Sequence, residues 1–583
     1  MNYDAIDAGA KQVHEVAVPE SWKSCEDEGL FSAEVKGSRT DVVDFVKNIQ
    51  TKVNAQEGNT LPVSAFKDYV DGSTPSGSSA YEKRGIAVDI PNWKPENCIQ
   101  CNRCAYVCPH AVIRPVALTE EEMANAPEGL EAIDMIGMPG MKFAITVSAY
   151  DCTGCGSCAN VCPGKKGEKA LVMENMEANA GEQVYFDFGT EIPVKPEVVA
   201  KFKENTVKGS QFKQPLLEFS GACAGCGETP YAKLITQLFG DRMYISNATG
   251  CSSIWGNSSP STPYTVNEKG QGPAWSNSLF EDAAEFGYGM LLAQRALRDG
   301  LKAKVESVLA SEAASAEAKA ACQEWLDTFE CGSTNGTATD KLVAALEGCD
   351  CDTCKDIVNN KDFLAKKSQW IFGGDGWAYD IGFGGVDHVL ASGKDINIMV
   401  FDTEVYSNTG GQSSKATKTG AIAQFAAGGK DVKKKDLASI AMSYGYVYVA
   451  QIAMGADFNQ TVKAISEAEA YPGPSLIIAY APCINHGIKK GMSKAQTEEQ
   501  LAVECGYWNN FRFNPAAEGA KFTLDSKEPN LEGYKDFLNG EVRYNALARF
   551  NPEKAEVMFA KNEAEAKERY AYLKKLVTLY GED

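Results

Sequence analysis

Hydrophobic and polar residues alternate along this chain with two different periods, and the changes of period divide it into regions. Between residues 215 and 500, short runs rich in β-branched residues alternate with longer segments of helical pattern. The strand-like runs are MYIS, WIF, INIMVF, VYVAQIA and SLIIAY, at 243–246, 370–372, 396–401, 447–453 and 475–480. Strands that alternate with helices in this way predict βαβ units around a parallel sheet.

Helical pattern without strand-like runs marks other parts of the chain. Residues from about 292 to 365 are Ala-rich and charged, so we expect a helical insertion on the outside of the sheet. The tail from Asn551 to Leu576 is expected to form a helix that is exposed or packed against a partner. Near the N-terminus, a helical stretch is followed by a Gly-, Ser- and Pro-rich connector at 71–85.

Length and composition narrow the class of protein. A chain of 583 residues is long enough for three to four domains, and 44% hydrophobic residues are typical of a globular protein. No apolar run approaches the ~20 residues of a membrane span, and the first residues lack the pattern of a signal peptide. A net charge of −21 argues against nucleic acid as the main partner. We therefore expect a cytoplasmic protein that binds neither membrane nor nucleic acid.

Eight of the nineteen cysteines form two complete metal-binding runs, CIQCNRCAYVCP at 98–109 and CTGCGSCANVCP at 152–163. Both have the spacing C-x2-C-x2-C-x3-C-P of bacterial two-cluster ferredoxins, in which the fourth cysteine ligates the other cluster. Zinc is the alternative, but zinc ligands usually come as two separated pairs. The spacing predicts two 4Fe-4S clusters with an inserted loop at 119–142 between the runs. The ligands would be Cys98, Cys101, Cys104 and Cys162 for one cluster, and Cys152, Cys155, Cys158 and Cys108 for the other.

A strand that ends in Gly-Asp-Gly is followed by a helical segment and by a second strand that ends in DTEVYSNTGGQ. This order is how thiamine diphosphate enzymes hold Mg2+, a hard cation that prefers oxygen ligands. Asp375 would supply a carboxylate, Thr403 a side-chain oxygen and Val405 a backbone carbonyl. The glycines would let the backbone approach the diphosphate at a helix N-terminus. The general motif usually has Asn where this chain has Thr403, but Thr still offers an oxygen.

Four further cysteines have positions that suggest a common site. Cys251 and Cys483 each follow a predicted strand, and the carboxyl ends of parallel strands meet at one edge of a sheet. Cys223 and Cys226 precede a predicted helix and could face the same edge. Convergence of the four would make a third 4Fe-4S cluster; a thioredoxin-like Cys-x-x-Cys pair and inert thiols are the alternatives.

The remaining cysteines have weaker signals. Cys349, Cys351 and Cys354 form the sequence CDCDTC in the helical insertion, where unligated surface thiols are a better interpretation than a metal site. No role is assigned to the other four: Cys25, Cys322, Cys331 and Cys505. Among the four histidines only His486, beside Cys483, is expected near the chemistry.

From about residue 60 onward the chain resembles the C-terminal half of pyruvate:ferredoxin (flavodoxin) oxidoreductases. The segments that carry the resemblance are both cysteine runs, YEKRGIAVDIPNW, CAGCGETPY, TGCSSIWG, GGDGWAYDIGFGG, DTEVYSNTGGQ and APCINHG. It implies that Cys223, Cys226, Cys251 and Cys483 ligate a cluster next to thiamine diphosphate, and that Asn408 lies close to the reacting carbon. It also implies a cofactor-binding wall made of Glu228, Cys251, Gly374, Asp375, Gly376, Trp377, Thr403, Glu404, Val405, Tyr406, Ser407 and Asn408.

The resemblance implies an activity and partners as well. Pyruvate would be oxidatively decarboxylated to acetyl-CoA and CO2 with coenzyme A, and electrons would pass through three 4Fe-4S clusters to ferredoxin or flavodoxin. The family's site lies between two domains, and residues 1–95 are too short for the other one. We therefore expect a separate subunit or the rest of a longer polypeptide to complete the site, within a homo-oligomer. Another 2-oxoacid as substrate and a non-catalytic iron–sulfur carrier are the alternative functions.

The expected fold class is α/β: a parallel-sheet thiamine diphosphate-binding domain joined to a small α+β domain like bacterial ferredoxins. The expected divisions are an N-terminal segment at 1–95, the two-cluster domain at 96–170, a linker at 171–214, the cofactor domain at 215–505 and a C-terminal extension at 506–583.

Lys165 and Lys166 make the loop after the second run basic, so it could dock an acidic ferredoxin. A solvated loop without a partner is the alternative.

Overall fold

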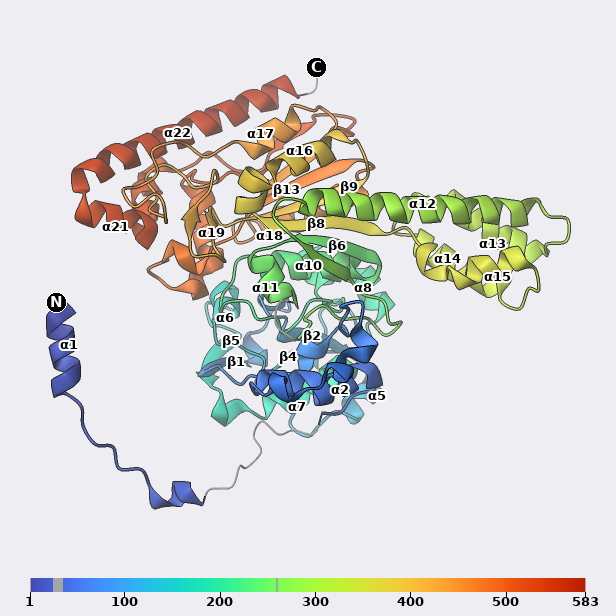
Figure 1. Cartoon of the computed structure of the whole chain (residues 1–583), viewed down its shortest axis with the longest axis horizontal. Coiled ribbons are helices and arrows are strands. Elements are labelled where there is room, and N and C mark those ends of the chain that lie inside the picture. The colour runs from blue at the N-terminus through green and yellow to red at the C-terminus, as the bar shows by residue number, and fades with distance from the viewer. Residues whose placement is uncertain (1, 25–34, 258–260, 582–583) are drawn as a thin grey trace.

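The structure is a computed structural model that describes residues 2–24, 35–257 and 261–581. Its largest part is an eight-stranded sheet with the strand order β15-β14-β12-β13-β9-β8-β6-β7 (Figure 1). The strands from β12 to β7 in this order are parallel, and β14 and β15 add an antiparallel edge. The bounds are β6 (Met243–Ala248), β7 (Ala274–Ser278), β8 (Ser368–Gly374), β9 (Ile396–Asp402), β12 (Tyr448–Ile452), β13 (Pro474–Tyr480), β14 (Phe511–Phe513) and β15 (Phe522–Leu524).

Helices cover both faces of this sheet, which explains why its central strands β9 and β13 are buried along their whole length. Every residue of β9 and β13 is buried, as expected for parallel strands between two helical layers. On one face Trp370, Phe372 and Met399 pack against α10 (Thr229–Phe239), α11 (Cys251–Asn257) and α18 (Phe458–Ala470). On the other face Ile371 and Ile398 pack against α12 (Ala283–Ala310), α16 (Phe383–Ala391) and α17 (Leu437–Met442). The predicted α/β class with a parallel sheet is confirmed.

The C-terminal segment is part of the large core. After α19 (Ala495–Glu504) and the two antiparallel strands come α20 (Tyr534–Gly540), α21 (Val542–Phe550) and α22 (Pro552–Leu579). Phe559, Leu573 and Leu576 of α22 are buried in the same cluster as the sheet residues Ile371 and Ile398. The expectation of an exposed or partner-packed tail helix was therefore wrong, because one apolar stripe of α22 covers its own chain.

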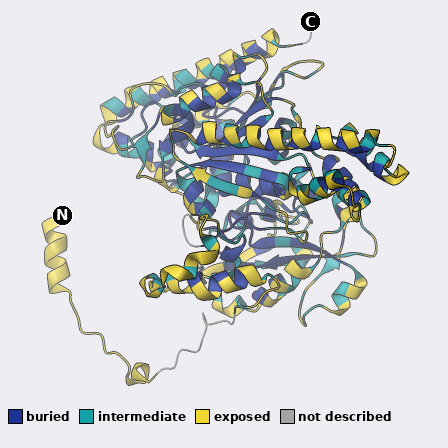
Figure 2. Ribbon diagram, turned by 45° about the vertical axis from the view of Figure 1, so that its right-hand side comes forward, coloured by how far each residue is buried: buried dark blue, intermediate teal, exposed yellow. Residues whose placement is uncertain are grey.

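The helical insertion is a projection with a core of its own (Figures 1 and 2). α12 begins on the sheet, where a Cβ at Gly287 would lie 2.7 Å from Cγ1 of Ile371. Its later turns leave the sheet and pack against α13 (Ala316–Asp327), α14 (Asn335–Leu346) and α15 (Asp352–Asn359). Trp325, fully buried, lies in this second cluster, which shares no residue with the sheet cores.

The small domain contains both cysteine runs. β2 (Ile113–Leu118), β3 (Ile133–Asp134) and β4 (Lys142–Val147) form one antiparallel sheet, and β1 (Asp89–Trp93) pairs with β5 (Leu171–Asn175). The short helices α4 (Arg103–Tyr106) and α6 (Ser157–Val161) lie within the runs, and α5 (Glu120–Ala124) lies in the inserted loop. Residues 171–214, expected as a linker, instead supply β5 and the helices α7 (Glu182–Glu191), α8 (Pro196–Phe202) and α9 (Val207–Ser210).

The small domain is docked on the face of the sheet that carries α10 and α18. The Tyr106 hydroxyl donates to the carbonyl of Phe458 at 3.1 Å, and the buried ammonium of Lys233 donates to the carbonyl of Tyr106 at 3.0 Å. Residues 40–54 form a nearly continuous helix of α2 (Thr40–Phe45), a π-helical turn and α3 (Thr51–Asn54). α1 (Asn2–Lys11) stands apart, and the described residues from Asn2 to Ser24 are all exposed (Figure 2).

None of the helices that the structure describes combines the length and the apolar character needed to cross a membrane.

Because the projection has a core of its own, we expect its stability to be independent of the stability of the sheet. Trp325→Ala should cost about 3–5 kcal/mol of local stability, because it empties a fully buried site. Hydrogen exchange should accelerate in α13–α15 and stay unchanged in β8 and β9. Leu297→Ala, which removes a 48% exposed side chain from α12, is the control and should change neither. Equal acceleration in β8 would contradict the separation of the two cores.

Candidate active site and metal centres

Four adjacent strands bring the predicted site residues to one edge of the sheet. In the order β13-β9-β8-β6, Cys483 follows β13, Thr403 follows β9, Asp375 follows β8 and Cys251 follows β6. All four strands are parallel, so their carboxyl ends meet at the same edge. Residues up to 232 positions apart in the chain thereby become neighbours.

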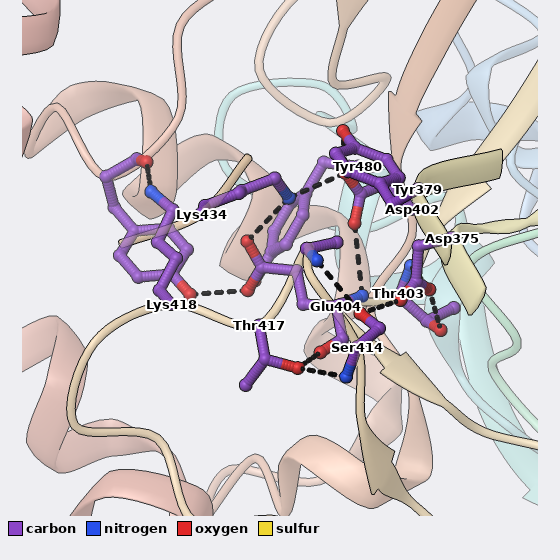
Figure 3. A network of polar contacts seen from close by, with 12 residues as sticks. Asp375, Tyr379, Asp402, Thr403, Glu404, Ser414, Thr417, Lys418, Lys434 and Tyr480 are labelled. Carbon is purple, nitrogen blue, oxygen red and sulfur yellow. Dashed lines mark hydrogen bonds and ion pairs between the residues drawn. The ribbon is translucent and has the colours of Figure 1, made fainter. Parts of the chain in front are cut away.

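Asp375, Thr403 and Val405 form one cluster of oxygen atoms, of which Figure 3 labels Asp375 and Thr403. Oδ1 of Asp375 accepts from the backbone N–H of Thr403 at 3.1 Å and from its hydroxyl at 3.0 Å. The same hydroxyl lies 3.0 Å from the carbonyl oxygen of Val405, and the Ser414 hydroxyl donates to Oδ2 of Asp375 at 2.6 Å. A carboxylate, a hydroxyl and a carbonyl that converge in this way are a donor set that fits Mg2+.

The charge of Asp375 also fits a cation. Its side chain is fully buried, and burial together with the Asp402 carboxylate raises its pKa well above the usual range. Among the described residues, Asp375 belongs to no ion pair within 4.0 Å. A divalent cation in contact with this carboxylate would stabilise its charged form.

The rest of the predicted cofactor wall surrounds this cluster. Gly374 ends β8, and Gly376 and Trp377 begin a π-helical segment, Gly376–Ile381. A Cβ at Gly376 would lie 2.4 Å from Cδ1 of Tyr406, so any larger residue there would displace the Tyr406 ring. Tyr406 lies in the two-residue strand β10 (Val405–Tyr406), which pairs with β11 (Gln412–Ser413). Asn408, in the loop between these strands, is exposed.

Glu404 anchors the loop that carries Thr403 and Val405. It has a φ of +60°, a conformation that non-glycine residues adopt uncommonly, and its side chain is fully buried. Its carboxylate lies 3.2 Å from Nζ of Lys434 (Figure 3). It also lies 2.9 Å from Nη1 of Arg543 and accepts from the Tyr507 hydroxyl. Burial alone would raise the pKa of Glu404, but the charges of Lys434 and Arg543 lower it below the usual range. We infer that this buried ionic anchor holds the loop in its unusual conformation.

His486 connects the same loop to the cysteine after β13. Burial and the charge of Arg543 lower the pKa of His486 to about 3, so the ring is neutral. Nε2 lies 2.7 Å from the carbonyl oxygen of Thr403 and therefore carries the proton. Nδ1 then accepts from the backbone N–H of Cys483 at 3.4 Å. One imidazole thus bridges the candidate metal loop and a candidate cluster ligand.

Cys223, Cys226, Cys251 and Cys483 converge from three segments of the chain. Burial and the neighbouring Glu228 raise the pKa values of the Cys226 and Cys251 thiols, and burial raises that of Cys483 to about 12. Glu228 is also buried, which raises its pKa to about 7, and it accepts from Nε1 of Trp255 at 2.7 Å. Deprotonated ligands would need a compensating positive centre here, as an iron–sulfur cluster supplies.

A hydroxyl pair links these cysteines to the oxygen cluster. Sγ of Cys251 lies 3.3 Å from the hydroxyl of Ser407, and the Thr403 hydroxyl lies 3.5 Å from the same Ser407 oxygen. The two candidate centres are therefore neighbours through a single side chain.

The eight cysteines of the two runs line two cavities in the predicted groups. Cys98, Cys101, Cys104 and Cys162 line one, and Cys108, Cys152, Cys155 and Cys158 line the other. In each cavity, three cysteines from one run are joined by the fourth from the other run. The cavity walls are mostly apolar side chains such as Trp93, Phe143 and Ile145. Such walls keep water from a bound cluster.

The three cysteine groups lie in a fixed order. The backbone N–H of Gly225, between Cys223 and Cys226, lies against the sulfur of Cys155. Cys158 in turn is close enough to Cys104 for their charges to interact. Cys101 also lines a surface cavity together with Arg103 and Lys208. The groups therefore run from the sheet edge, through the Cys152 cavity, to the Cys98 cavity near the surface.

The residues that hold the loop in place, Lys434 and Arg543, have no distinctive signal in the sequence. Lys434 belongs to the run DVKKKD, which is typical of a solvated surface, and Arg543 lies in the C-terminal segment. No local pattern distinguishes either from an exposed charge.

The other cysteines stay apart from these centres: Cys322, Cys354 and Cys505 are buried, Cys349 is intermediate, Cys331 and Cys351 are exposed, and Cys25 lies outside the described residues.

Three family models match the chain. A domain of unknown function covers residues 33–87, a 4Fe-4S dicluster domain covers 97–166, and the C-terminal TPP (thiamine pyrophosphate) binding domain of thiamine pyrophosphate enzymes covers 361–479. The second contains both cysteine runs, and the third contains Asp375, Thr403 and Val405.

Several curated proteins are similar over almost the whole chain. A pyruvate-flavodoxin oxidoreductase of Enterobacter agglomerans is 53% identical over an alignment of 590 positions, which covers 99% of this chain and 49% of that protein. A pyruvate:ferredoxin oxidoreductase of Moorella thermoacetica is 54% identical, with 99% and 49% covered. The chain spans about half the length of these relatives. A solved 2-oxoglutarate:ferredoxin oxidoreductase from Magnetococcus marinus shares 16% identity over 46% of this chain and 65% of its own, with a TM-score of 0.27.

The ionic anchor predicts an effect on cofactor binding. Glu404→Gln should weaken Mg2+-dependent binding of thiamine diphosphate about 10- to 100-fold, because Arg543 and Lys434 would lose their buried counter-charge. Titration calorimetry measures the affinity. Glu568→Gln is the matched control: Glu568 lies 3.6 Å from Lys433, and its side chain is 73% exposed, so removing this pair should have no effect. Unchanged affinity in a folded Glu404→Gln protein would contradict the anchor.

Proposed function

Because the chain is homologous over 99% of its length to pyruvate:ferredoxin and pyruvate-flavodoxin oxidoreductases, we propose that it is the cofactor-binding half of such an enzyme. The reaction would be the oxidative decarboxylation of pyruvate to acetyl-CoA and CO2, with coenzyme A as acyl acceptor and ferredoxin or flavodoxin as electron acceptor. The observation that carries the proposal is the direct contact between two candidate centres, in which Ser407 touches both Cys251 and Thr403.

Mg2+ would be held by Asp375, Thr403 and Val405, and it would neutralise the diphosphate of the cofactor. Bound thiamine diphosphate supplies a carbon nucleophile that accepts the electrons left when CO2 departs. The chain's own residues orient the cofactor. The glycines of Gly374–Gly376 let the backbone approach it, the loop Thr403–Asn408 would lie along it with Asn408 near the reacting carbon, and Glu228 and Cys251 would complete the wall.

Three 4Fe-4S clusters would carry the electrons in the order of the cysteine groups. The first, on Cys223, Cys226, Cys251 and Cys483, would lie beside the cofactor. The second, on Cys108, Cys152, Cys155 and Cys158, would follow through the contact between Gly225 and Cys155. The third, on Cys98, Cys101, Cys104 and Cys162, would deliver electrons near the surface. Single-electron carriers suit this oxidation, which would release its two electrons one at a time.

The substrate side of the site would come from the missing half. The relatives are about twice as long as this chain, so a partner subunit or a longer polypeptide would supply the residues that bind pyruvate and activate the cofactor. A homo-oligomer of the complete assembly is part of the same proposal.

The composition of the metal centres tests the proposal. The anaerobically purified protein should contain about twelve irons, as three cubanes require, and Cys223→Ser should lower the number to about eight. Asp375→Asn should leave the iron unchanged and abolish Mg2+-dependent binding of thiamine diphosphate, because the buried carboxylate is lost. Eight irons without cofactor binding in the unchanged protein would favour a non-catalytic carrier. With the missing half added, a preference for another 2-oxoacid over pyruvate would contradict the assignment of pyruvate as the substrate.

Electron delivery can be tested at the loop after Cys162. Lys165 and Lys166 are exposed there, and the loop's Pro163 and Gly164 line the Cys98 cavity. Lys165→Glu with Lys166→Glu should slow association with an acidic ferredoxin on the order of tenfold at low salt, and added salt should reduce the difference. Lys302→Glu on the remote helix α12 is the control and should have no effect. Equal association rates for all three proteins at low salt would contradict docking at this loop.

A further inference from the structure

Three cysteines gather at the start of α15. In the sequence they are far from the cysteines of the centres described above. They belong to the sequence CDCDTC, at the junction of α14 and α15 in the helical projection. Cys351 is exposed, Cys349 is partly buried and Cys354 is buried. The thiol of Cys354 lies against the thiols of both Cys349 and Cys351. Neither the family models nor the candidate sites include these residues.

Cys351 has the position of an attacking thiol. It is the N-cap of the eight-residue helix α15, and although its sulfur makes no capping hydrogen bond, it lies close to the backbone N–H groups of Thr353 and Cys354. These N–H groups are the unpaired donors of the first helical turn and favour a negative charge. They lower the pKa of Cys351, whose side chain is open to solvent. A larger thiolate fraction on an accessible sulfur makes it the more reactive thiol of the group.

Cys354 has the position of a resolving thiol. It is the third residue of α15, one turn beyond the N-cap, so its side chain lies next to that of Cys351. It is 4% exposed and packs into the core of the projection beside Ile357. Burial and the two neighbouring cysteines raise its pKa to about 12. An attacking thiolate at the N-cap and a protonated partner one turn later are arranged for dithiol–disulfide exchange.

We propose that Cys351 and Cys354 form a redox-active dithiol that exchanges with small disulfides. The Cys351 thiolate attacks a disulfide R–S–S–R, the S–S bond breaks, and one RS− leaves as a mixed disulfide forms on Cys351. Cys354 loses its proton and attacks the Cys351 sulfur, which expels the second RS−. The two thiols of the protein are oxidised by two electrons, the small disulfide is reduced to two RSH, and the protons of the dithiol pass to them.

The charges around Cys351 select the disulfide. Asp350 and Asp352 flank it and are exposed, and the cation nearest in sequence, Lys355, is paired with Asp350 at 3.3 Å. A cationic disulfide is therefore attracted to this helix start and an anionic one is repelled. We expect cystamine to react faster than oxidised glutathione, with a difference that shrinks as salt is added.

The experiment treats the anaerobic protein, with its clusters in place, with cystamine, followed by acid quenching, alkylation and peptide mapping. We expect an internal Cys351–Cys354 disulfide to form in unchanged protein. Cys351→Ser should slow oxidation of Cys354 by at least about tenfold, since the accessible thiolate is gone. Cys354→Ala should trap cysteamine on Cys351, and its circular dichroism should match that of unchanged protein. Cys349→Ser should leave the internal disulfide unaffected.

Cys331 provides a control within the same molecule. It is exposed, and the hydroxyls of Ser333 and Thr334 lower its pKa to about 7, but the cysteine nearest to it in sequence, Cys322, is buried. A cysteamine adduct should therefore persist on Cys331 and not on Cys351. A persistent adduct on Cys351 in unchanged protein, a Cys349–Cys354 bridge in place of Cys351–Cys354, or oxidised glutathione reacting faster than cystamine would each overturn the proposal.

Discussion

Parallel strands end at one edge of their sheet, and everything at the candidate site depends on that constraint. The backbone hydrogen bonds between β13, β9, β8 and β6 fix the register in which the four strands end. The loops that follow them can then be only a few residues long and still place Cys483, Thr403 and Asp375 together. Helices on both faces keep the strands dry, so the side chains at the edge meet in a buried environment where charge must be matched.

The spacing of the two cysteine runs was enough to predict which of their cysteines lie together. The grouping of the eight run cysteines follows from the ferredoxin pattern, and the structure lines two cavities with the same sets. The parallel sheet was predictable because short strand-like runs alternate with longer helical segments, and the structure buries every residue of β9 and β13. What could not be predicted depends on contacts between distant residues. Lys434 looks like its neighbours in a lysine run, yet its ammonium lies 2.6 Å from the buried carboxylate of Asp402.

Two expectations failed because polar composition does not reveal which face of an element is covered. Residues 171–175 follow the second cysteine run and were interpreted as the start of a linker, but β5 closes the small domain by pairing with β1. α22 is rich in Glu and Lys, and the stripe that includes Phe559 and Leu573 packs on the sheet domain. The C-terminal segment also contributes Arg543 to the anchor of Glu404, so it is structurally part of the cofactor domain.

The continuity of α12 has a mechanical consequence. A helix of 28 residues is about 42 Å long, and its two ends are embedded in different cores. Its hydrogen bonds run without a break from the turns on β6 and β8 to the turns beside α13, so it behaves as a rigid rod. Displacing the tip of the projection would therefore apply a torque to the sheet, and a chain that dispensed with the projection would have to terminate this helix with a new cap.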